Sequence, residues 1–228
     1  MCLRAGLRCR SGLGVRPGAF ESPFPASHAL RRSGLAARGE EIQAAVEKVA
    51  THHGRIDILV NNAGVEIDKG FAEVSSQDWD LIMGVNLRGA FWLTQRALPF
   101  FPPEGGAVIN ISSIHAWRAF PGSTVYACSK AALVALTRNL ALELAPRRIR
   151  VNAICPGYID TRLWEEHLLR SPNAARIASE VTALHPLGRR GQPADVGDAA
   201  LFLASEQSAF ITGTDLVVDG GLTIRAHA

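Results

Sequence analysis

The segment "IDILVNNAG" at residues 56–64 carries the pattern that decides the fold. It begins as an apolar run of strand length and ends in a polar loop that contains a glycine. Two later segments repeat the pattern: "GAVINISS" at 106–113 runs into two serines, and "IRVNAICPG" at 149–157 ends in a Pro-Gly turn. Short apolar runs bounded by turn residues are typical of buried strands. The sequence therefore predicts three strands whose C-terminal ends all lead into polar or turn residues.

Segments with helical periodicity separate these strands. In "EEIQAAVEKVATHHG" at 40–54, Ile42, Val46 and Val49 share one helix face and Gly54 ends the helix. Apolar strands that alternate with helices predict a doubly wound parallel α/β sheet, which binds ligands beyond the C-terminal ends of its strands. The further expected elements are long helices at 76–101 and 129–145, a helix at 195–205 and a fourth strand at 214–221.

Residues 1–38 differ in composition from the rest of the chain. They hold seven Arg, no Lys and one Glu, a formal charge of +6, without sustained periodicity. We expect an irregular Arg-rich segment outside the fold, followed by a single domain at 39–228. Because the whole chain carries +3, this domain carries −3, which argues against a nucleic-acid-binding protein.

Hydropathy and cysteine usage narrow the class further. No apolar run is long enough to span a bilayer, so we expect no membrane association. The four cysteines, Cys2, Cys9, Cys128 and Cys155, have neither the paired spacing of a zinc site nor the density of a disulfide scaffold. We therefore expect no metal site and a reducing compartment, the cytoplasm.

The segment "STVYACSK" at 123–130 places Tyr126 and Lys130 four residues apart. On a helix these two side chains lie on the same face. A nearby cation favours the phenolate form, so the pair predicts a tyrosine whose pKa Lys130 lowers toward neutrality. The alternative is an ordinary pair of side chains on a solvated helix.

Five motifs in this order resemble the short-chain dehydrogenase/reductase family. They are "NNAG" at 61–64, the Asn of "VNLRG" at Asn86, "NISS" at 110–113, "YxxxK" at 126–130 and "PGxxxT" at 156–161. The resemblance covers about residues 40–225 and implies a Rossmann-like fold. The segments "TRLWEEH" and "HPLGRRGQPADVG" resemble the branch that holds 17-beta-hydroxysteroid/L-fucose dehydrogenases and sugar or polyol dehydrogenases.

The resemblance implies catalytic roles for Asn86, Ser113, Tyr126 and Lys130. Tyr126 would exchange a proton with the substrate oxygen, and Ser113, thirteen residues earlier, would stabilise charge there. Lys130 would also hold the nicotinamide ribose. Asn86 would hold a water leading from Lys130 to solvent, or else be a buried Asn that satisfies a backbone group. Ser112 would face away from the site.

The cofactor implied by the family is NAD or NADP, with NAD slightly favoured by the branch resemblance. The residues implied to bind it are Asn61, Ala63, Gly64, Tyr126, Lys130, Pro156, Gly157, Ile159 and Thr161.

The family's first strand and its glycine-rich phosphate loop, T-G-x-x-x-G-x-G, are missing from the sequence. "GLGVRPG" at 12–18 has reversed glycine intervals and an internal proline, so the fold is expected to be N-terminally truncated. Strand residues 58–60 would then lie at a free sheet edge. Residues 1–38 resemble a mitochondrial transit peptide in composition, which leaves the mitochondrion as the alternative compartment. An unrelated stretch from a misassigned start or a shifted reading frame explains both the composition and the missing loop, and it is favoured.

The candidate substrate residues mix polar and aromatic groups. Glu66 and His115 would hydrogen-bond a sugar or polyol, whereas Trp117, Tyr158 and Trp164 would form walls around a steroid-like alcohol. His167 lies in the same segment as Trp164. His115 is equally well explained as a surface loop residue.

Two hypotheses follow. The first is an NAD(P)-dependent oxidoreductase acting on an alcohol or carbonyl compound. The second is a catalytically silent relative with impaired cofactor binding that acts in assembly only. The many apolar residues on the two long helices predict a homodimer or homotetramer in either case.

Overall fold

A five-stranded sheet in the order β1-β2-β3-β4-β5 forms the centre of the structure, a computed structural model that describes residues 2–4, 39–169 and 172–225. Four neighbouring strands run parallel, as expected: β2 (Ile58–Asn61), β3 (Gly106–Ile111), β4 (Ile149–Pro156) and β5 (Asp215–Val218). The predicted Rossmann-like α/β fold is thereby confirmed.

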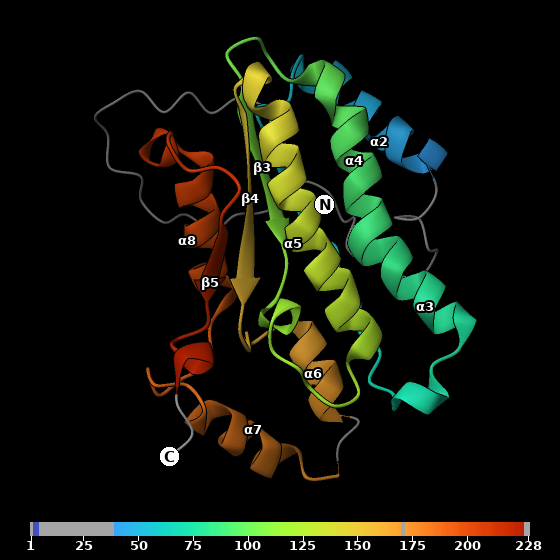
Figure 1. The fold of residues 1–228 in the computed structure, drawn as a ribbon, viewed down its shortest axis with the longest axis vertical. Helices are drawn as coiled ribbons and strands as arrows, with labels where there is room; N and C mark the ends of the chain where they lie inside the picture. Colours follow the sequence, from blue (N-terminus) through green and yellow to red (C-terminus); the bar gives the residue numbers. More distant parts are fainter. Residues whose placement is uncertain (1, 5–38, 170–171, 226–228) are drawn as a thin grey trace.

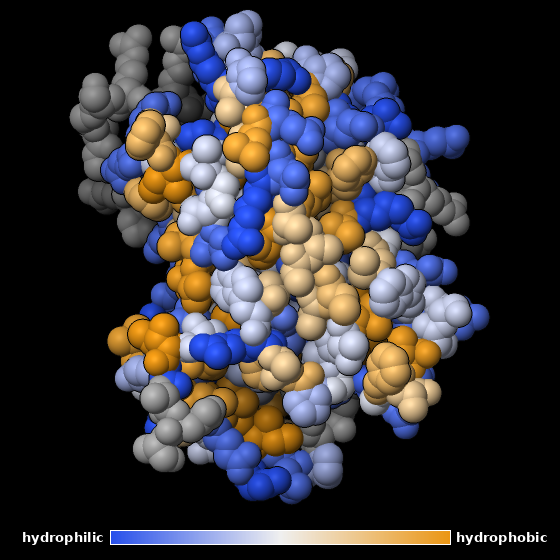
Figure 2. All heavy atoms as spheres, in the orientation of Figure 1, coloured by the Kyte–Doolittle hydropathy of each residue, from blue (hydrophilic) through white to orange (hydrophobic). Residues whose placement is uncertain are grey.

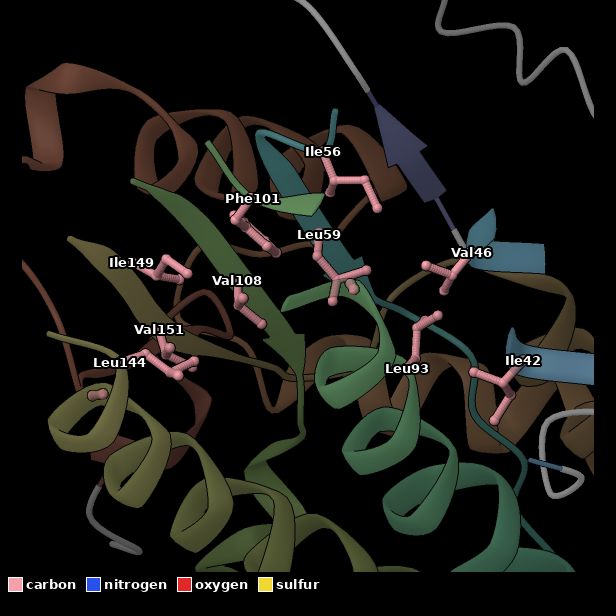
Figure 3. Packing of buried hydrophobic residues seen from close by; sticks show 12 residues of the cluster. Ile42, Val46, Ile56, Leu59, Leu93, Phe101, Val108, Leu144, Ile149 and Val151 are labelled. Atoms are coloured by element: carbon pink, nitrogen blue, oxygen red, sulfur yellow. The ribbon is translucent and has the colours of Figure 1, made fainter. Parts of the chain in front are cut away.

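Helices cover both faces of this sheet (Figure 1). On one face pack α2 (Gly39–His53), α4 (Gly89–Ala97) and α5 (Thr124–Leu144), and on the other packs α8 (Pro193–Ala204). Strand alternation explains the two layers, since successive side chains point to opposite faces. Val108 joins the cluster with Val46 and Leu93 on the first face (Figure 3), whereas its neighbour Ile109 packs against Leu203 on the second.

The helix expected at 76–101 is interrupted in the structure. α3 (Ser76–Met83), capped by Ser75, leads into a π-helical turn (Gly84–Arg88), then into α4 and a 3-10 turn (Leu98–Phe100). Such π turns insert one extra residue per turn and are frequent at functional sites. Here the turn carries Asn86, which is 1% exposed.

The edge of the sheet at β2 differs from the sequence-based expectation. β1 (Cys2–Arg4) pairs antiparallel with β2, with Cys2 opposite Val60 and Arg4 opposite Ile58. The prediction that residues 58–60 form a free edge is therefore wrong. An unpaired strand edge accepts any extended segment, because backbone hydrogen bonds are independent of side-chain identity. The rest of the predicted irregular segment, 5–38, lies outside the described residues.

Two helices that the sequence did not predict follow β4. α6 (Arg162–Leu169) and α7 (Ala174–Ala183) lie near the C-terminal ends of the strands (Figure 1). Helices this short are marginal on their own and depend on packing, although the apolar periodicity of both segments was a signal for them. In the described part of the chain, no helix is both long and apolar enough to cross a membrane.

Candidate active site

Ser113, Tyr126 and Lys130 lie together just beyond the C-terminal end of β3. Ser113 follows that strand and begins the 3-10 turn Ile114–Ala116, whereas Tyr126 and Lys130 come from the first two turns of α5. The Ser113 hydroxyl is close enough to Tyr126 to lower the pKa of the phenol. All three residues are less than 9% exposed. The predicted helical spacing of Tyr126 and Lys130 is confirmed.

Ser112 and Ser113 face different ways, as expected for neighbours at a strand end. Ser112 Oγ donates to the backbone oxygen of Lys130 at 2.9 Å and so ties β3 to α5. Ser113 Oγ instead accepts from the His115 backbone N–H at 3.2 Å and lies 3.1 Å from His115 Nδ1. Only Ser113 is therefore placed beside Tyr126.

Lys130 is held by a backbone oxygen rather than by a carboxylate. Its Nζ donates to the oxygen of Ile111 at 2.8 Å and lies 5.5 Å from the centre of the Tyr126 ring. Burial lowers the pKa of Lys130 to about 8, while the negative charge of Glu66 acts in the opposite direction. The ammonium is therefore mostly charged at neutral pH despite its burial.

The pKa of Tyr126 corrects one sequence-based expectation. Burial raises this pKa well above its ordinary value, the negative charge of Glu66 raises it further, and only the hydrogen bond with Ser113 lowers it. The expected lowering by Lys130 is wrong for this structure, because desolvation of the phenolate dominates and Lys130 is not among the groups that lower this pKa. At neutral pH Tyr126 is a phenol, which is the form that donates a proton.

Asn86 fixes the loop that follows β2. Its Oδ1 accepts from the Val65 backbone N–H at 2.8 Å, and its Nδ2 donates to the Val65 oxygen and to Ser129 Oγ, each at 3.0 Å. These contacts realise the alternative of a buried Asn that satisfies backbone groups. Both amide protons are used, so a role for Asn86 in holding a water stays a prediction.

The side chain of Asn61 turns into the protein rather than toward a cofactor groove. Its Nδ2 donates to Thr94 Oγ1 at 3.0 Å and to Asn110 Oδ1 at 2.7 Å, and Asn110 in turn donates to Thr137 Oγ1 at 2.8 Å. This buried polar network joins β2, β3, α4 and α5. The Nδ2 group of Asn61 is thereby committed to the interior, whereas its buried Oδ1 has no hydrogen-bond partner among the described residues. Sequence reasoning missed the network, although an Asn inside an apolar strand was a signal for it.

Gly64 is suited to the approach of a ligand to Lys130. A Cβ atom at this position would lie 3.4 Å from Lys130 Nζ and 3.7 Å from Asn86 Oδ1. Glycine therefore leaves the ammonium uncovered by a side chain on this side, which fits a sugar hydroxyl bound to Lys130. Ala63, next to it, is exposed.

The predicted cofactor residues after β4 form a tightly packed turn. Pro156 is buried and pairs with Val218, and a Cβ atom at Gly157 would lie 2.9 Å from Asp219 Cβ. The sheet already requires this glycine, whatever its role toward a cofactor. Ile159 forms a parallel bridge with Gly191.

Thr161 is committed to the start of α6, because its Oγ1 accepts from the Trp164 backbone N–H at 3.4 Å. Its binding to a nicotinamide carboxamide stays a prediction.

Four of the five predicted substrate residues gather near the catalytic group. His115 lies 5.2 Å from the ring centre of Tyr126, and Tyr158 lies 5.3 Å from that of Trp164. Glu66 Oε1 lies 4.0 Å from His115 Nε2.

Trp117 is 42% exposed and makes none of these ring contacts. Phe120 and His185, which sequence reasoning missed, complete the aromatic group. Phe120 stacks on His115, and the rings of Phe120 and His185 each contact Tyr158. The side chain of His167 lies outside the described residues.

The family can be assigned from this site together with comparisons to known proteins. A family model described as "Enoyl-(Acyl carrier protein) reductase" matches residues 36–223, which is most of the chain. The chain belongs to the short-chain dehydrogenase/reductase family. The resemblance read from the motifs is confirmed, and the chain is an NAD(P)-dependent oxidoreductase by membership of this family.

Several curated relatives and a solved structure are similar over the same region. The 3-oxoacyl-[acyl-carrier-protein] reductase FabG of Thermotoga maritima is 43% identical over 188 residues, covering 81% of this chain and 73% of the relative. The L-fucose dehydrogenase of Bos taurus is 41% identical over 185 residues, covering 81% and 68%. The ligand-free aldohexose dehydrogenase of Thermoplasma acidophilum superimposes with a TM-score of 0.80 at 36% identity, covering 85% of this chain and 78% of that one.

Proposed function

We propose that this protein transfers a hydride between a nicotinamide dinucleotide and a small alcohol or the corresponding carbonyl compound, with Tyr126 exchanging the proton. The observation that carries the proposal is the assembly of Ser113, Tyr126 and Lys130 at buried positions, with Lys130 Nζ 5.5 Å from the centre of the Tyr126 ring. A bound nicotinamide supplies or accepts the hydride. The chain's own residues bind the reacting oxygen and move the proton.

In the reducing direction, Tyr126 donates its phenolic proton to the carbonyl oxygen and Ser113 donates a hydrogen bond to the same oxygen. The raised pKa of Tyr126 keeps the phenol protonated, which suits this direction. In the oxidising direction Tyr126 must first lose its proton. We therefore expect alcohol oxidation to accelerate as the pH rises above neutrality.

Lys130 is proposed to hold the ribose of the dinucleotide. Its one described hydrogen bond, to Ile111, uses one of three N–H donors, and the glycine at position 64 places no side chain against the ammonium. NAD is slightly favoured over NADP, on the resemblance to the L-fucose and sugar dehydrogenase branch alone. Sugars, polyols and steroid-like alcohols are the substrate classes that the residues around Tyr126 suggest.

Assembly as a homodimer or homotetramer is also proposed. Trp79, Leu81, Phe91 and Leu142 on α3, α4 and α5 are 40% or more exposed, and a surface hollow of about 530 Å³ lies between these helices. Figure 2 shows apolar atoms exposed over the middle of α5 on this face. The proposed compartment is the cytoplasm, where thiols such as those of Cys128 and Cys155 stay reduced.

The second candidate function, a catalytically silent relative acting in assembly, shares this surface. The assembled group of Ser113, Tyr126 and Lys130 supports the enzyme over the silent relative.

The test uses the full purified chain with millimolar NAD⁺ or NADP⁺ and a set of sugar, polyol and steroid alcohols. Formation of reduced nicotinamide that requires Tyr126 supports the proposal. Absence of turnover with either dinucleotide and every alcohol, and with the matching ketones in the reverse direction, contradicts it.

A further inference from the structure

Glu66, His115 and Ser123 form a polar group on the substrate side of Tyr126. Ser123 Oγ donates to Glu66 Oε1 at 2.8 Å, and the same oxygen lies 4.0 Å from His115 Nε2. The Glu66 and His115 side chains are 25% and 12% exposed. The carboxylate is adjacent to the catalytic group through His115, whose ring centre lies 5.2 Å from that of Tyr126.

The loop that carries Glu66 is fixed at both ends. Val65, directly before it, is bonded through both backbone groups to Asn86. Lys69, three residues after it, donates its backbone N–H to the Gly122 oxygen at 3.0 Å. Gly122 has a φ of +81°, and a Cβ atom there would collide with Asp68 at 2.0 Å. The carboxylate of Glu66 is therefore held in place before any substrate arrives.

The ring of His115 is also held in a fixed orientation. Its ring stacks on Phe120 at 4.2 Å between centres and meets Tyr126 edge-on. Burial and the charge of Lys130 lower the pKa of His115 to about 4, so the imidazole is neutral at physiological pH. Since Nε2 faces a carboxylate, which only accepts hydrogen bonds, we assign the proton to Nε2. Nδ1 then accepts from the Ser113 hydroxyl in the chain without substrate, and that hydroxyl turns to the reacting oxygen when a substrate binds.

The two facing atoms are then one acceptor and one donor. A separation of 4.0 Å is too long for a direct hydrogen bond but allows a third oxygen to lie within bonding distance of both. A neutral hydroxyl satisfies both at once, because it donates to Glu66 and accepts from His115. A carboxylate would be repelled by Glu66, and a methylene would leave two polar atoms facing hydrocarbon.

We propose that Glu66 and His115 bind a second hydroxyl group of the substrate, on a carbon near the reacting one. The reacting oxygen is placed by Ser113 and Tyr126, and His115 connects Ser113 to the second hydroxyl through its two ring nitrogens. The substrate class is thus a polyol, a sugar or a hydroxyketone. This inference rests on the proposed function, because the position of the reacting carbon follows from Ser113 and Tyr126.

The experiment compares kcat/KM for cis-cyclohexane-1,2-diol and cyclohexanol in the full chain at millimolar dinucleotide. A hydrogen bond to a charged group contributes ~1.5–3 kcal/mol, so we expect the diol to be preferred by roughly ten- to a hundredfold. Glu66→Gln keeps the shape but replaces the carboxylate by an amide, and should reduce this preference at least fivefold. Glu73→Gln, an exposed acid in the same loop, is the matched control and should leave the preference unchanged.

The outcomes distinguish failure of the second-hydroxyl inference from failure of the proposed function. If cyclohexanol or a steroid alcohol is oxidised as well as the diol, the inference is wrong while the proposed function stands. If no alcohol or ketone is turned over, the proposed function fails. Saturation-transfer NMR then tests the subsite itself, where diol binding weakened by Glu66→Gln supports the inference and unchanged or absent binding overturns it. Should Glu66→Gln not fold by circular dichroism, Ser123→Ala, which releases the carboxylate, replaces it with the same expected direction.

Discussion

The two sides of the site are built very differently. On the side of β3 and α5, Ser113, Tyr126 and Lys130 are buried, and nearby backbone groups hold Ser113 and Lys130 in place. On the side of β2, the neighbouring strand is the antiparallel β1, and the side chain of Asn61 is bonded into the interior. The comparison teaches that the proton-transfer group needs only β3 and α5, which are close together in sequence. Phosphate binding depends instead on which segment of the chain pairs with β2.

Dinucleotide binding tests the weaker side and has the largest expected effect. The printed sequence contains no T-G-x-x-x-G-x-G loop. Two or three missing hydrogen bonds to a charged phosphate, at ~1.5–3 kcal/mol each, weaken binding by roughly a hundredfold to a millionfold. We therefore expect the dissociation constant for NADH or NADPH, measured by cofactor fluorescence, to be millimolar or weaker.

The matched chain for that measurement replaces residues 1–38 by a first βαβ segment of the family type, and should bind at least a hundredfold tighter. Micromolar binding of NADH or NADPH by the unmodified chain would contradict this expectation. It would mean that the β2 side of the site binds the dinucleotide phosphates without the T-G-x-x-x-G-x-G loop.

Tyr126→Phe tests the stronger side. Loss of the proton donor should lower kcat by roughly two to four orders of magnitude, the range for general acid–base groups. Folding should be retained, because only a hydroxyl is removed. Cys128→Ala, at an exposed position of the same helix, is the control and should keep kcat within about threefold. A kcat within threefold of the parent for Tyr126→Phe contradicts the assignment.

Asn86→Ala tests how the two sides are connected. The substitution removes three hydrogen bonds and leaves both backbone groups of Val65 without these partners. At ~0.5–1.5 kcal/mol per bond, we expect the free energy of unfolding in urea to fall by roughly 1.5–4.5 kcal/mol. Asn139→Ala, which removes one exposed bond to the Ala135 oxygen, should cost less than about 0.5 kcal/mol. An equal fall in the free energy of unfolding for both variants would show that the hydrogen bonds of Asn86 to Val65 do not stabilise the fold.

The pH dependence of stability tests the burial of His115. Its pKa is about 4 in the folded chain against an ordinary 6.5, with Lys130 as the charged neighbour that lowers it. Below pH 6.5 the unfolded chain takes up a proton that the folded chain does not, so stability falls as the pH falls from 6.5 toward 4. From about pH 7 to about pH 5 this group should cost roughly 2 kcal/mol of unfolding free energy.

His115→Asn has no group that titrates in this range, so it should lose that part of the acid destabilisation in urea unfolding curves. An identical pH slope in the parent and the variant would contradict the burial of the ring.

Much of the fold and part of the site could be predicted from the sequence. The strands at 58–61, 106–111 and 149–156 follow from apolar runs, and the pairing of Tyr126 with Lys130 follows from helical spacing. The choice of Ser113 over Ser112 follows from strand alternation. Each is a local property, fixed by the period of the backbone.

The remaining features depend on contacts between segments far apart in the chain. Three of them have no local signature: the π-helical turn at Gly84–Arg88, the antiparallel pairing of β1 and the approach of Glu66 to His115. The raised pKa of Tyr126 has none either, because desolvation depends on everything that surrounds the phenol. The sequence by itself determined which elements form and which chemical groups they carry. Tertiary packing alone decided how far apart those groups lie and how much water reaches them, since distance and burial set the energy of every polar contact.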